Sequence, residues 1–372
     1  MSKQQQRHLL IVGASGVIGS GAVKHFSGRP GWQVTAVSRR RPIVGDDSVF
    51  THVVVDLSDR DACAAAVAKM PPVTEMIYAA VAETPGLVAG WFDTELMEAN
   101  GRMFANILDP VAAGGSLRHL SLLQGVKAYG ALHHPIEVPA REDRPRDDHA
   151  NFYWLHEDHA RLRASEAGFA LTIFRPPVLL GSAPGAAMNP VAAIGAYAAL
   201  CRELGRPLAY FGDADSLLEV IDTGLLAEGF EWAAISPAAV NQIFNITNGD
   251  LLALGHAWPE IAAALDMASE GEPPPNLVDF FAQEDSQAAW GRLVARHGLR
   301  VPTLSALLGQ SHHYADLLFG ARVAKRSMPT LLSTVKIRQA GFGACRDSVA
   351  SLRYWLRRMV DLRLLPPFGE HT

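Results

Sequence analysis

The sequence is poor in cysteine, and its charges nearly cancel. Its 372 residues include three cysteines, Cys63, Cys201 and Cys345, and none of them belongs to a CxxC pair. An odd number of scattered cysteines is typical of reduced thiols, so we expect a cytoplasmic protein without a disulfide framework. The 33 lysines and arginines nearly balance the 38 aspartates and glutamates. This balance argues against nucleic acid or an anionic membrane as a partner.

Long apolar runs are also absent. No uninterrupted apolar stretch reaches the length of a membrane span. The N-terminal MSKQQQRH leads directly into the first predicted strand, which leaves no room for a signal peptide. We therefore expect a globular protein, whose length favours one large or two coupled domains.

What the sequence does contain is a glycine-rich turn between an apolar strand and a helix. Residues 8–19 read HLLIVGASGVIG. The apolar run predicts a buried parallel strand, and a helix is expected to begin near Val17. Glycines in this spacing permit a tight turn and a close approach of the backbone to a pyrophosphate, which the helix N-terminus also attracts. The residues expected to contact a dinucleotide here are Gly13, Ser15, Gly16, Val17, Ile18 and Gly19.

The second strand, predicted over residues 32–37, indicates which nucleotide is bound. It is followed by Ser38, Arg39, Arg40 and Arg41. An enzyme that prefers NAD keeps an acidic residue at this point, whereas arginine accommodates a 2′-phosphate. We therefore expect NADPH as the cofactor, contacted by Ser38, Arg39 and Arg40, although a solvated loop would also explain the three arginines.

A third strand is predicted over residues 51–55 and ends in Asp56 and Leu57. An acidic residue at this point of the fold commonly lies near the adenine, so both residues are candidate cofactor contacts. A simple turn aspartate explains Asp56 nearly as well.

Strands and helices alternate along the chain, which predicts a doubly wound parallel Rossmann sheet of the α/β class with helices on both faces. Residues 1–185 are expected to form an NADP(H)-binding domain. Residues 186–372 are expected to form a smaller, mainly helical substrate-binding lobe, with a segment near 216–250 returning to the first domain. Further strands are predicted over residues 75–81, 117–123, 170–174, 207–211 and 242–247. Helices are predicted over residues 59–70, 94–108, 151–167, 189–204, 258–265 and 347–360, the last with Arg353, Arg357 and Arg358 on its solvent side.

One expected catalytic pair is missing. None of the seven tyrosines is followed four residues later by a lysine. Short-chain dehydrogenase-type enzymes use Tyr-x-x-x-Lys, in which the lysine lowers the pKa of the phenol. Its absence disfavours the ordinary epimerases and dehydratases of this architecture.

Two other motifs carry a resemblance to a known family. Residues 123–129 read LQGVKAY, and residues 151–158 read NFYWLHED. Together with GASGVIG and SRRRP, they resemble the progesterone 5β-reductase and iridoid synthase-like family of extended short-chain dehydrogenases/reductases. The resemblance covers nearly the whole chain. It implies NADPH-dependent reduction of the carbon–carbon double bond of an activated enone or enal and a small hydrophobic substrate. A homodimer is a further expectation from the family.

The same resemblance assigns candidate catalytic residues. Lys127 matches the family lysine. The functional tyrosine is matched to the second residue of a Tyr-Tyr pair, which is Trp154 here, while Tyr153 matches the first. The proton donor is therefore Tyr153, Tyr129 or the indole N–H of Trp154, and we favour Tyr153. His156, in the same motif, is expected on the surface of its helix.

Two other functions stay open at this point. One is ordinary carbonyl reduction with NADPH. The other is a non-catalytic regulator that senses NADP(H), because Trp154 replaces the tyrosine. A metal site is not expected, since the adjacent pairs at 133–134 and 312–313 place neighbouring histidines on different faces.

Overall fold

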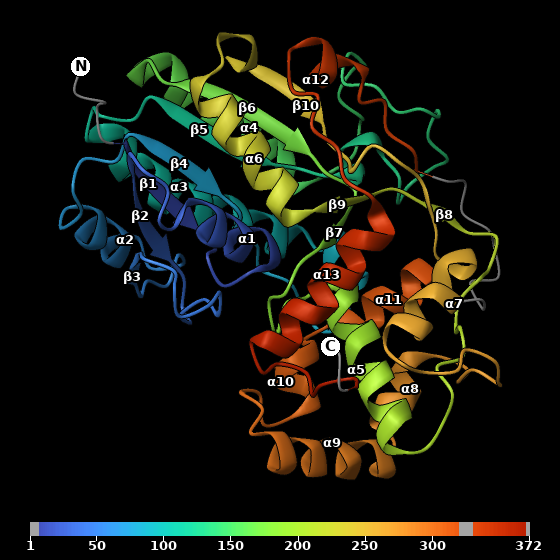
Figure 1. The fold of residues 1–372 in the computed structure, drawn as a ribbon. Coiled ribbons are helices and arrows are strands. Elements are labelled where there is room, and N and C mark those ends of the chain that lie inside the picture. The colour runs from blue at the N-terminus through green and yellow to red at the C-terminus, as the bar shows by residue number, and fades with distance from the viewer. Residues whose placement is uncertain (1–6, 320–329, 370–372) are drawn as a thin grey trace.

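A seven-stranded parallel sheet forms the first half of the structure. The computed structural model describes residues 7–319 and 330–369. The strands lie in the order β10-β6-β5-β4-β1-β2-β3, so the chain reverses direction across the sheet between β1 and β4 (Figure 1). Ligands of such sheets bind at the carboxyl ends of the strands, where the order reverses. The strands are β1 (Arg7–Val12), β2 (Trp32–Val37), β3 (Thr51–Val53), β4 (Glu75–Tyr78), β5 (His119–Leu123), β6 (Ala170–Arg175) and β10 (Gln242–Asn245).

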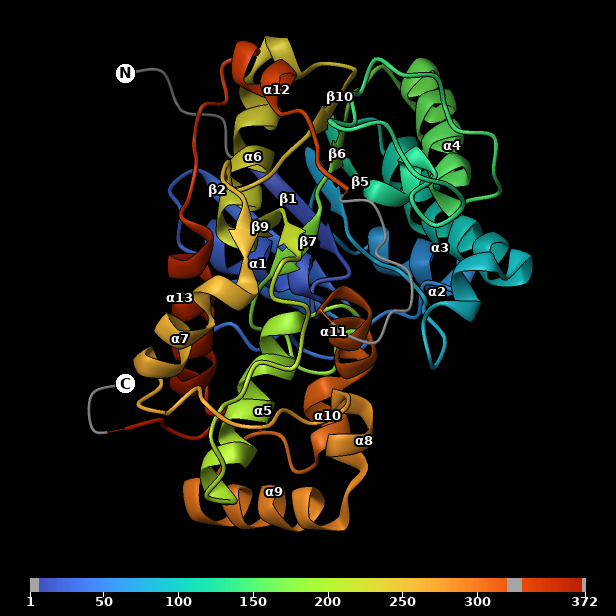
Figure 2. The same cartoon turned by 90° about the vertical axis from the view of Figure 1, so that its right-hand side faces the viewer.

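Helices cover both faces of the sheet, as the alternating pattern predicts (Figure 2). Helices α1 (Val17–Phe26) and α6 (Thr223–Ile235) pack against each other on one face. Helices α2 (Arg60–Val67), α3 (Thr94–Ala113) and α4 (Phe152–Ala167) pack side by side on the other. Central strand residues such as Leu10 and Ile11 are completely buried because both faces are covered. The predicted doubly wound parallel fold is confirmed.

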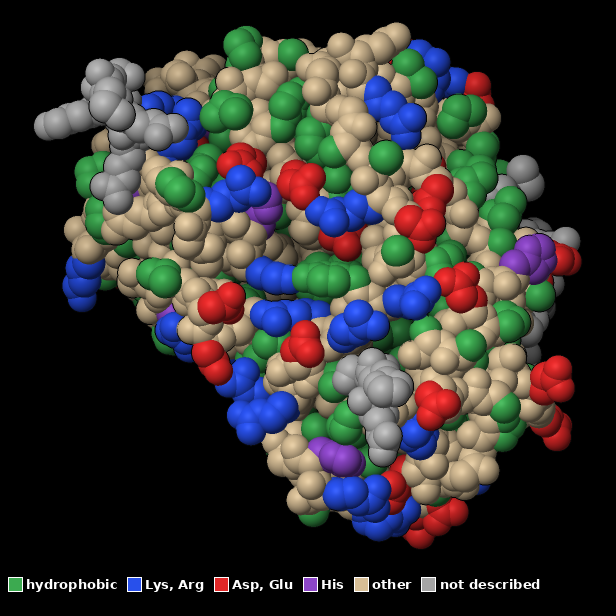
Figure 3. Space-filling model, viewed as in Figure 1, with side chains coloured by type: hydrophobic (Ala, Val, Ile, Leu, Met, Phe, Trp, Pro, Cys, Tyr) green, Lys and Arg blue, Asp and Glu red, His purple; other side chains and the backbone are tan. Residues whose placement is uncertain are grey.

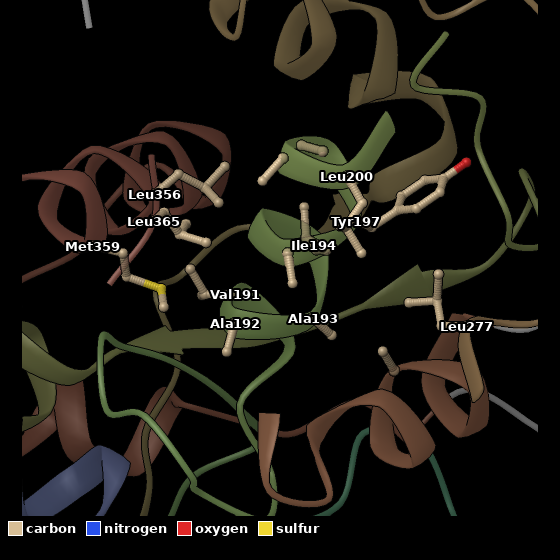
Figure 4. Packing of buried hydrophobic residues seen from close by; sticks show 14 of the residues in the cluster. Val191, Ala192, Ala193, Ile194, Tyr197, Leu200, Leu277, Leu356, Met359 and Leu365 are labelled. Carbon is tan, nitrogen blue, oxygen red and sulfur yellow. The ribbon is translucent and has the colours of Figure 1, made fainter. Parts of the chain in front are cut away.

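The second half of the chain is mainly helical and is built around α5 (Pro190–Glu203). This alanine-rich helix is buried over most of its length, and Figure 4 shows side chains from other segments surrounding it. Small residues let these neighbours approach closely: a Cβ added at Gly195 would lie 2.4 Å from a methyl group of Leu365. The surrounding helices are α7 (Leu254–Ala264), α8 (Leu277–Ala282), α9 (Glu284–His297), α10 (Leu304–Leu308), α11 (Ser311–Phe319) and α13 (Ser348–Asp361).

Short strand pairs connect the two halves. Strand β7 (Val178–Leu180) pairs in parallel with β9 (Val220–Asp222), and β8 (Leu217–Leu218) pairs with β11 (Leu252–Ala253). The chain leaves the sheet after β6 and returns through α6 and β10, which pairs with β6 at the sheet edge. Helix α12 (Val335–Gln339) packs near β10.

Some predicted boundaries differ from the observed ones. Strands β3 and β4 end earlier than predicted, at Val53 and Tyr78, whereas α3 continues to Ala113. The extra turn of α3 contains Pro110 and buries Val111 and Ala112 in the core, which offsets the cost of an internal proline.

The prediction of a strand over residues 207–211 is wrong. The carbonyl of Leu208 accepts a hydrogen bond from the Trp258 indole at 2.6 Å, and that of Ala209 accepts one from the Tyr197 hydroxyl at 2.9 Å. Side chains therefore satisfy backbone groups that a strand would use for pairing.

Basic side chains form a band across the middle of the face on which α1 and α13 lie (Figure 3). Arg353 and Arg357 of α13 are exposed, as predicted. Arg358 is half-buried instead, because its guanidinium donates to the backbone carbonyl of Val44. None of the helices in the described ranges is long and apolar enough to span a bilayer.

Candidate active site

The glycine-rich turn lies where the strand order reverses. Gly13 has a φ of 82°, and a Cβ there would come within 2.6 Å of the backbone of Ala79, after β4. A Cβ on Gly19 would lie 2.2 Å from the Gly13 carbonyl oxygen. Only glycine allows the strand, the turn and α1 to approach this closely. Ser15, Gly16 and Ile18 are half-exposed around the start of α1, whereas Val17 and Gly19 are buried. The turn therefore presents the helix N-terminus to a phosphate, and the predicted residues fit a dinucleotide.

The residues after β2 offer free cationic groups beside this turn. The Ser38 hydroxyl donates to the Arg40 carbonyl at 2.7 Å, which folds the segment. The side chains of Arg39 and Arg40 are exposed, and neither makes a hydrogen bond or ion pair with a described residue. The Arg41 guanidinium instead lies 4.5 Å from the centre of the Phe50 ring.

The two residues predicted near the adenine differ in their environments. Asp56 is exposed and accepts hydrogen bonds from the backbone N–H and the hydroxyl of Ser58, at 3.0 and 2.8 Å. These bonds lower the pKa of its carboxyl. Leu57 is buried in the core. Both follow β3 at the same edge as the arginines, and Asp56 already has a turn partner.

Lys127 lies in a short 3₁₀ turn, η2 (Val126–Tyr129), directly after β5. Its Nζ atom is 4.4 Å from the ring centre of Trp91 and 5.7 Å from those of Phe152 and Tyr153. No described carboxylate lies within ion-pair distance of it. Burial lowers the pKa of this amine, and the negative charge of Glu83 partly opposes the change.

The three candidate donors lie in different surroundings. The Trp154 indole donates to the His149 carbonyl at 2.9 Å, and its ring stacks with the Arg146 guanidinium. The Tyr129 hydroxyl donates to the Asn245 side chain at 2.6 Å. The Tyr153 hydroxyl makes no hydrogen bond with a described residue.

Tyr153 is also the candidate that faces Lys127. A Cβ placed on Gly125 would lie 3.1 Å from the Tyr153 hydroxyl, so the phenol extends over the end of β5. Burial raises the pKa of Tyr153. The first residue of the aromatic pair, and not Trp154, thus lies beside the lysine.

A buried polar network supports the start of α4. Gln124 accepts from Arg175 at 2.8 Å and donates to Glu157 at 2.7 Å. Glu157 in turn accepts two hydrogen bonds from Arg161. The predicted surface position of His156 is wrong: its ring is buried, and its Nε2 lies 2.9 Å from the Asn100 carbonyl.

Three residues around Lys127 and Tyr153 were not predicted from the sequence. Glu83 and Trp91 come from the irregular segment between β4 and α3, and Tyr314 comes from α11 in the helical half. Burial raises the pKa of the Tyr153 hydroxyl most, and Glu83 and Tyr314 raise it further. Glu83, Trp91 and Lys127 also line one pocket. No motif marked these positions.

Within residues 7–319 and 330–369, no group of three or more His, Cys, Asp and Glu side chains is arranged to hold a metal ion.

Comparison with known proteins assigns this arrangement to a family. Residues 9–247 match the model of the NAD dependent epimerase/dehydratase family. An (S)-8-oxocitronellyl enol synthase of Antirrhinum majus is 33% identical over 386 residues, which cover 98% of this chain and 95% of that protein. The chain belongs to the NAD dependent epimerase/dehydratase family. Within it, the chain is a member of the progesterone 5β-reductase and iridoid synthase-like group and is an oxidoreductase.

Another relative agrees with this assignment, and solved structures share the fold. A 3-oxo-Delta(4,5)-steroid 5-beta-reductase of Arabidopsis thaliana is 28% identical and covers 96% of this chain and 92% of its own length. A UDP-glucose 4-epimerase of Thermotoga maritima, solved with UDP-glucose, has a TM-score of 0.67 at 14% identity and covers 95% of this chain and 99% of its own. A Thermus thermophilus UDP-glucose 4-epimerase in complex with NAD has a TM-score of 0.63 at 16% identity, with coverages of 95% and 98%. At such identities the epimerase structures establish the fold alone.

Proposed function

We propose that this oxidoreductase uses NADPH to reduce the carbon–carbon double bond of an activated enone or enal by 1,4-addition of hydride. The observation that carries the proposal is the pairing of Lys127 with Tyr153, whose hydroxyl lies over Gly125 at the carboxyl end of β5. This edge of the sheet also carries the glycine-rich turn. The names of the relatives support the proposal, since they describe an enol synthase and a reductase of 3-oxo-Δ4,5-steroids.

Lys127 and Tyr153 are suited to stabilise the negative charge that develops on the substrate in such a reaction. When bound, the nicotinamide supplies the hydride, which adds to the β-carbon of the substrate. Negative charge then builds up on the carbonyl oxygen, and a hydrogen-bond donor fixed beside that oxygen lowers the barrier. Tyr153 has a hydroxyl without a described partner for this purpose, and the Lys127 ammonium lies 5.7 Å from the centre of the phenol ring.

The preference for NADPH over NADH rests on Arg39 and Arg40. Both guanidinium groups are exposed at the end of β2 without a described hydrogen-bond or ion-pair partner, next to the turn that would hold the pyrophosphate. Planar guanidinium groups bind phosphate oxygens in pairs. Gly13, Gly16 and Gly19 would hold the pyrophosphate, and the two arginines would hold the 2′-phosphate.

The test is consumption of NADPH with a panel of 2-cyclohexenone, progesterone and 8-oxogeranial, followed by identification of the product. A saturated carbonyl product supports 1,4-reduction, whereas an allylic alcohol would indicate ordinary carbonyl reduction. Binding of NADPH without oxidation across the panel would instead favour a nucleotide-sensing regulator.

Substitutions test which side chain donates to the developing oxyanion. We expect Tyr153→Phe to lower kcat by about 100- to 1000-fold, the usual cost of removing one donor to a developing oxyanion, and Lys127→Ala to lower it as well. Trp154→Phe is the matched control, because the indole N–H of Trp154 already donates to the His149 carbonyl. An unchanged rate in Tyr153→Phe, or an equal loss in Trp154→Phe, would refute the assignment of the phenol.

A further inference from the structure

The segment between β4 and α3 is fixed at several points. Asn100 accepts from the Ala82 N–H at 2.8 Å and donates to the Ala82 carbonyl at 3.1 Å. The Gly86 N–H donates to the Gln310 side chain in the helical half at 2.8 Å. Asp93 caps α3 by accepting from two backbone N–H groups. These contacts place a 3₁₀ turn, η1 (Ala89–Phe92), beside the active site.

Trp91 is the residue of η1 that reaches Lys127. Its indole N–H donates to Glu83 Oε2 at 3.0 Å, which fixes the plane of the ring. The face of that ring is then presented to the Lys127 ammonium at 4.4 Å, closer than either of the other two rings. Ring faces attract cations, and the attraction increases where water is excluded.

A lysine in such surroundings needs something to fix its position. In the described ranges, the Lys127 ammonium makes neither an ion pair nor a hydrogen bond. A long, flexible side chain without a partner would sample several rotamers, and its charge would reach Tyr153 for part of the time only. The Trp91 ring therefore supplies an attraction that a carboxylate usually provides.

We propose that Trp91, oriented by its hydrogen bond to Glu83, is the positioning residue that holds the Lys127 ammonium beside Tyr153. The proposal rests on the proposed function for its catalytic consequence, but the position of the lysine can be measured without any substrate. Phe92, the next residue of η1, is exposed and makes an edge-to-face contact with the His133 ring instead. It provides a matched control.

The experiment is proton–carbon NMR of the full-length protein after reductive ¹³C-methylation of its six lysines. Methyl groups over an indole face are shifted upfield by its ring current. We expect upfield pairs from Lys127 and from Lys24, whose Nζ lies 5.2 Å from the centre of the Trp355 ring. The Lys127 pair is the one that is lost in Lys127→Arg, and the Lys24 pair should be the same in every Trp91 and Phe92 variant. Trp91→Leu should abolish the shift, Trp91→Phe should retain part of it, and Phe92→Leu should leave it unchanged. Persistence of the shift in Trp91→Leu, or equal loss in Phe92→Leu, would overturn the proposal.

Glu83 variants keep the test decisive if Trp91→Leu fails to fold. Glu83→Leu removes the acceptor of the indole N–H, so the upfield shift should diminish, whereas Glu83→Gln keeps a carbonyl acceptor and should restore it. Equal spectra for the two variants would contradict the role of the hydrogen bond.

Kinetics provides the second readout. If the enzyme reduces an enone, Trp91→Leu should lower kcat by about three- to thirtyfold, the range expected for losing one cation–π contact, and Trp91→Phe should recover much of it. If the wild-type enzyme reduces none of the enones, the proposed function fails, while the NMR result still decides the position of Lys127.

Discussion

Replacing Arg39 and Arg40 separately tests the proposed preference for NADPH. Both side chains follow β2, are exposed, and lack a described hydrogen-bond partner. They are therefore available to the 2′-phosphate, the group that distinguishes NADPH from NADH. Arg41, the third arginine of the run, already lies on the Phe50 ring and serves as the control.

The expected loss of affinity for NADPH follows from the exposure of the two arginines. A hydrogen bond to a charged group is worth about 1.5–3 kcal/mol when shielded from water. Solvent and salt screen exposed groups, so we expect about 1–2 kcal/mol for each arginine, which is roughly five- to thirtyfold in Kd. Arg39 is the cleaner probe, because the Arg40 guanidinium also approaches Gly185 in the helical half: a Cβ built there would lie 2.8 Å from it.

The assay is titration of NADPH and of NADH by fluorescence, at low and moderate salt, for Arg39→Ala, Arg40→Ala and Arg41→Ala. Affinity for NADPH should fall in the first two variants, more steeply at low salt, while affinity for NADH stays the same. If each variant weakens NADH as much as NADPH, or if Arg41→Ala matches the other two, the arginines do not read the 2′-phosphate.

Three further predictions concern geometry and stability. Gly125→Ala should lower kcat by about tenfold with little change in Tm, because its Cβ would lie 3.1 Å from the Tyr153 hydroxyl and displace it; an unchanged kcat would contradict this. Asp222→Ala should destabilise the fold by about 2–4 kcal/mol in urea unfolding, since Asp222 caps α6 and also accepts from the buried Trp355 indole. Asp347→Ala, which removes only the exposed cap of α13, should cost about 1 kcal/mol, and equal losses would refute the added role of Trp355. Burial raises the pKa of the Glu219 carboxyl from 4.5 to about 7, so the folded state binds this proton more tightly than the unfolded state does. The protonated carboxyl therefore stabilises the fold fully below pH 4.5, and this stabilisation is lost as the pH rises through 7. Glu219→Gln should therefore be more stable than the wild type at pH 8, by up to about 3 kcal/mol, and the gain should shrink at pH 5.5; an equal difference at both pH values would refute it.

The parts of the fold that local patterns determine were predictable. The strand over residues 32–37 and the helix start at Val17 match the predictions, because an apolar run and a glycine turn act through their own backbone. The cytoplasmic location, the homodimer and the absence of nucleic-acid partners stay predictions.

The parts that depend on distant contacts were not predictable. Glu83 and Trp91 lie in an irregular segment whose position is fixed by Asn100 and Gln310. Tyr314 reaches the site only because α11 packs against α5, the centre of the helical half. No spacing rule connects such residues to Lys127, since their proximity arises from packing between elements far apart in the chain.

The choice between Tyr153 and Trp154 illustrates the same limit within a single motif. Neighbouring residues of a helix point about 100° apart, so Tyr153 and Trp154 have different surroundings, and one of them lies beside Lys127. Which one does so depends on where the helix begins. Asn151 decides this, because its side chain accepts from the Tyr153 N–H at 3.0 Å and makes Phe152 the first helical residue. The helix then directs Trp154 toward His149 and leaves Tyr153 over Gly125. A tryptophan at position 154 therefore does not remove the phenol from the site, and the case for a non-catalytic regulator loses the feature on which it depended.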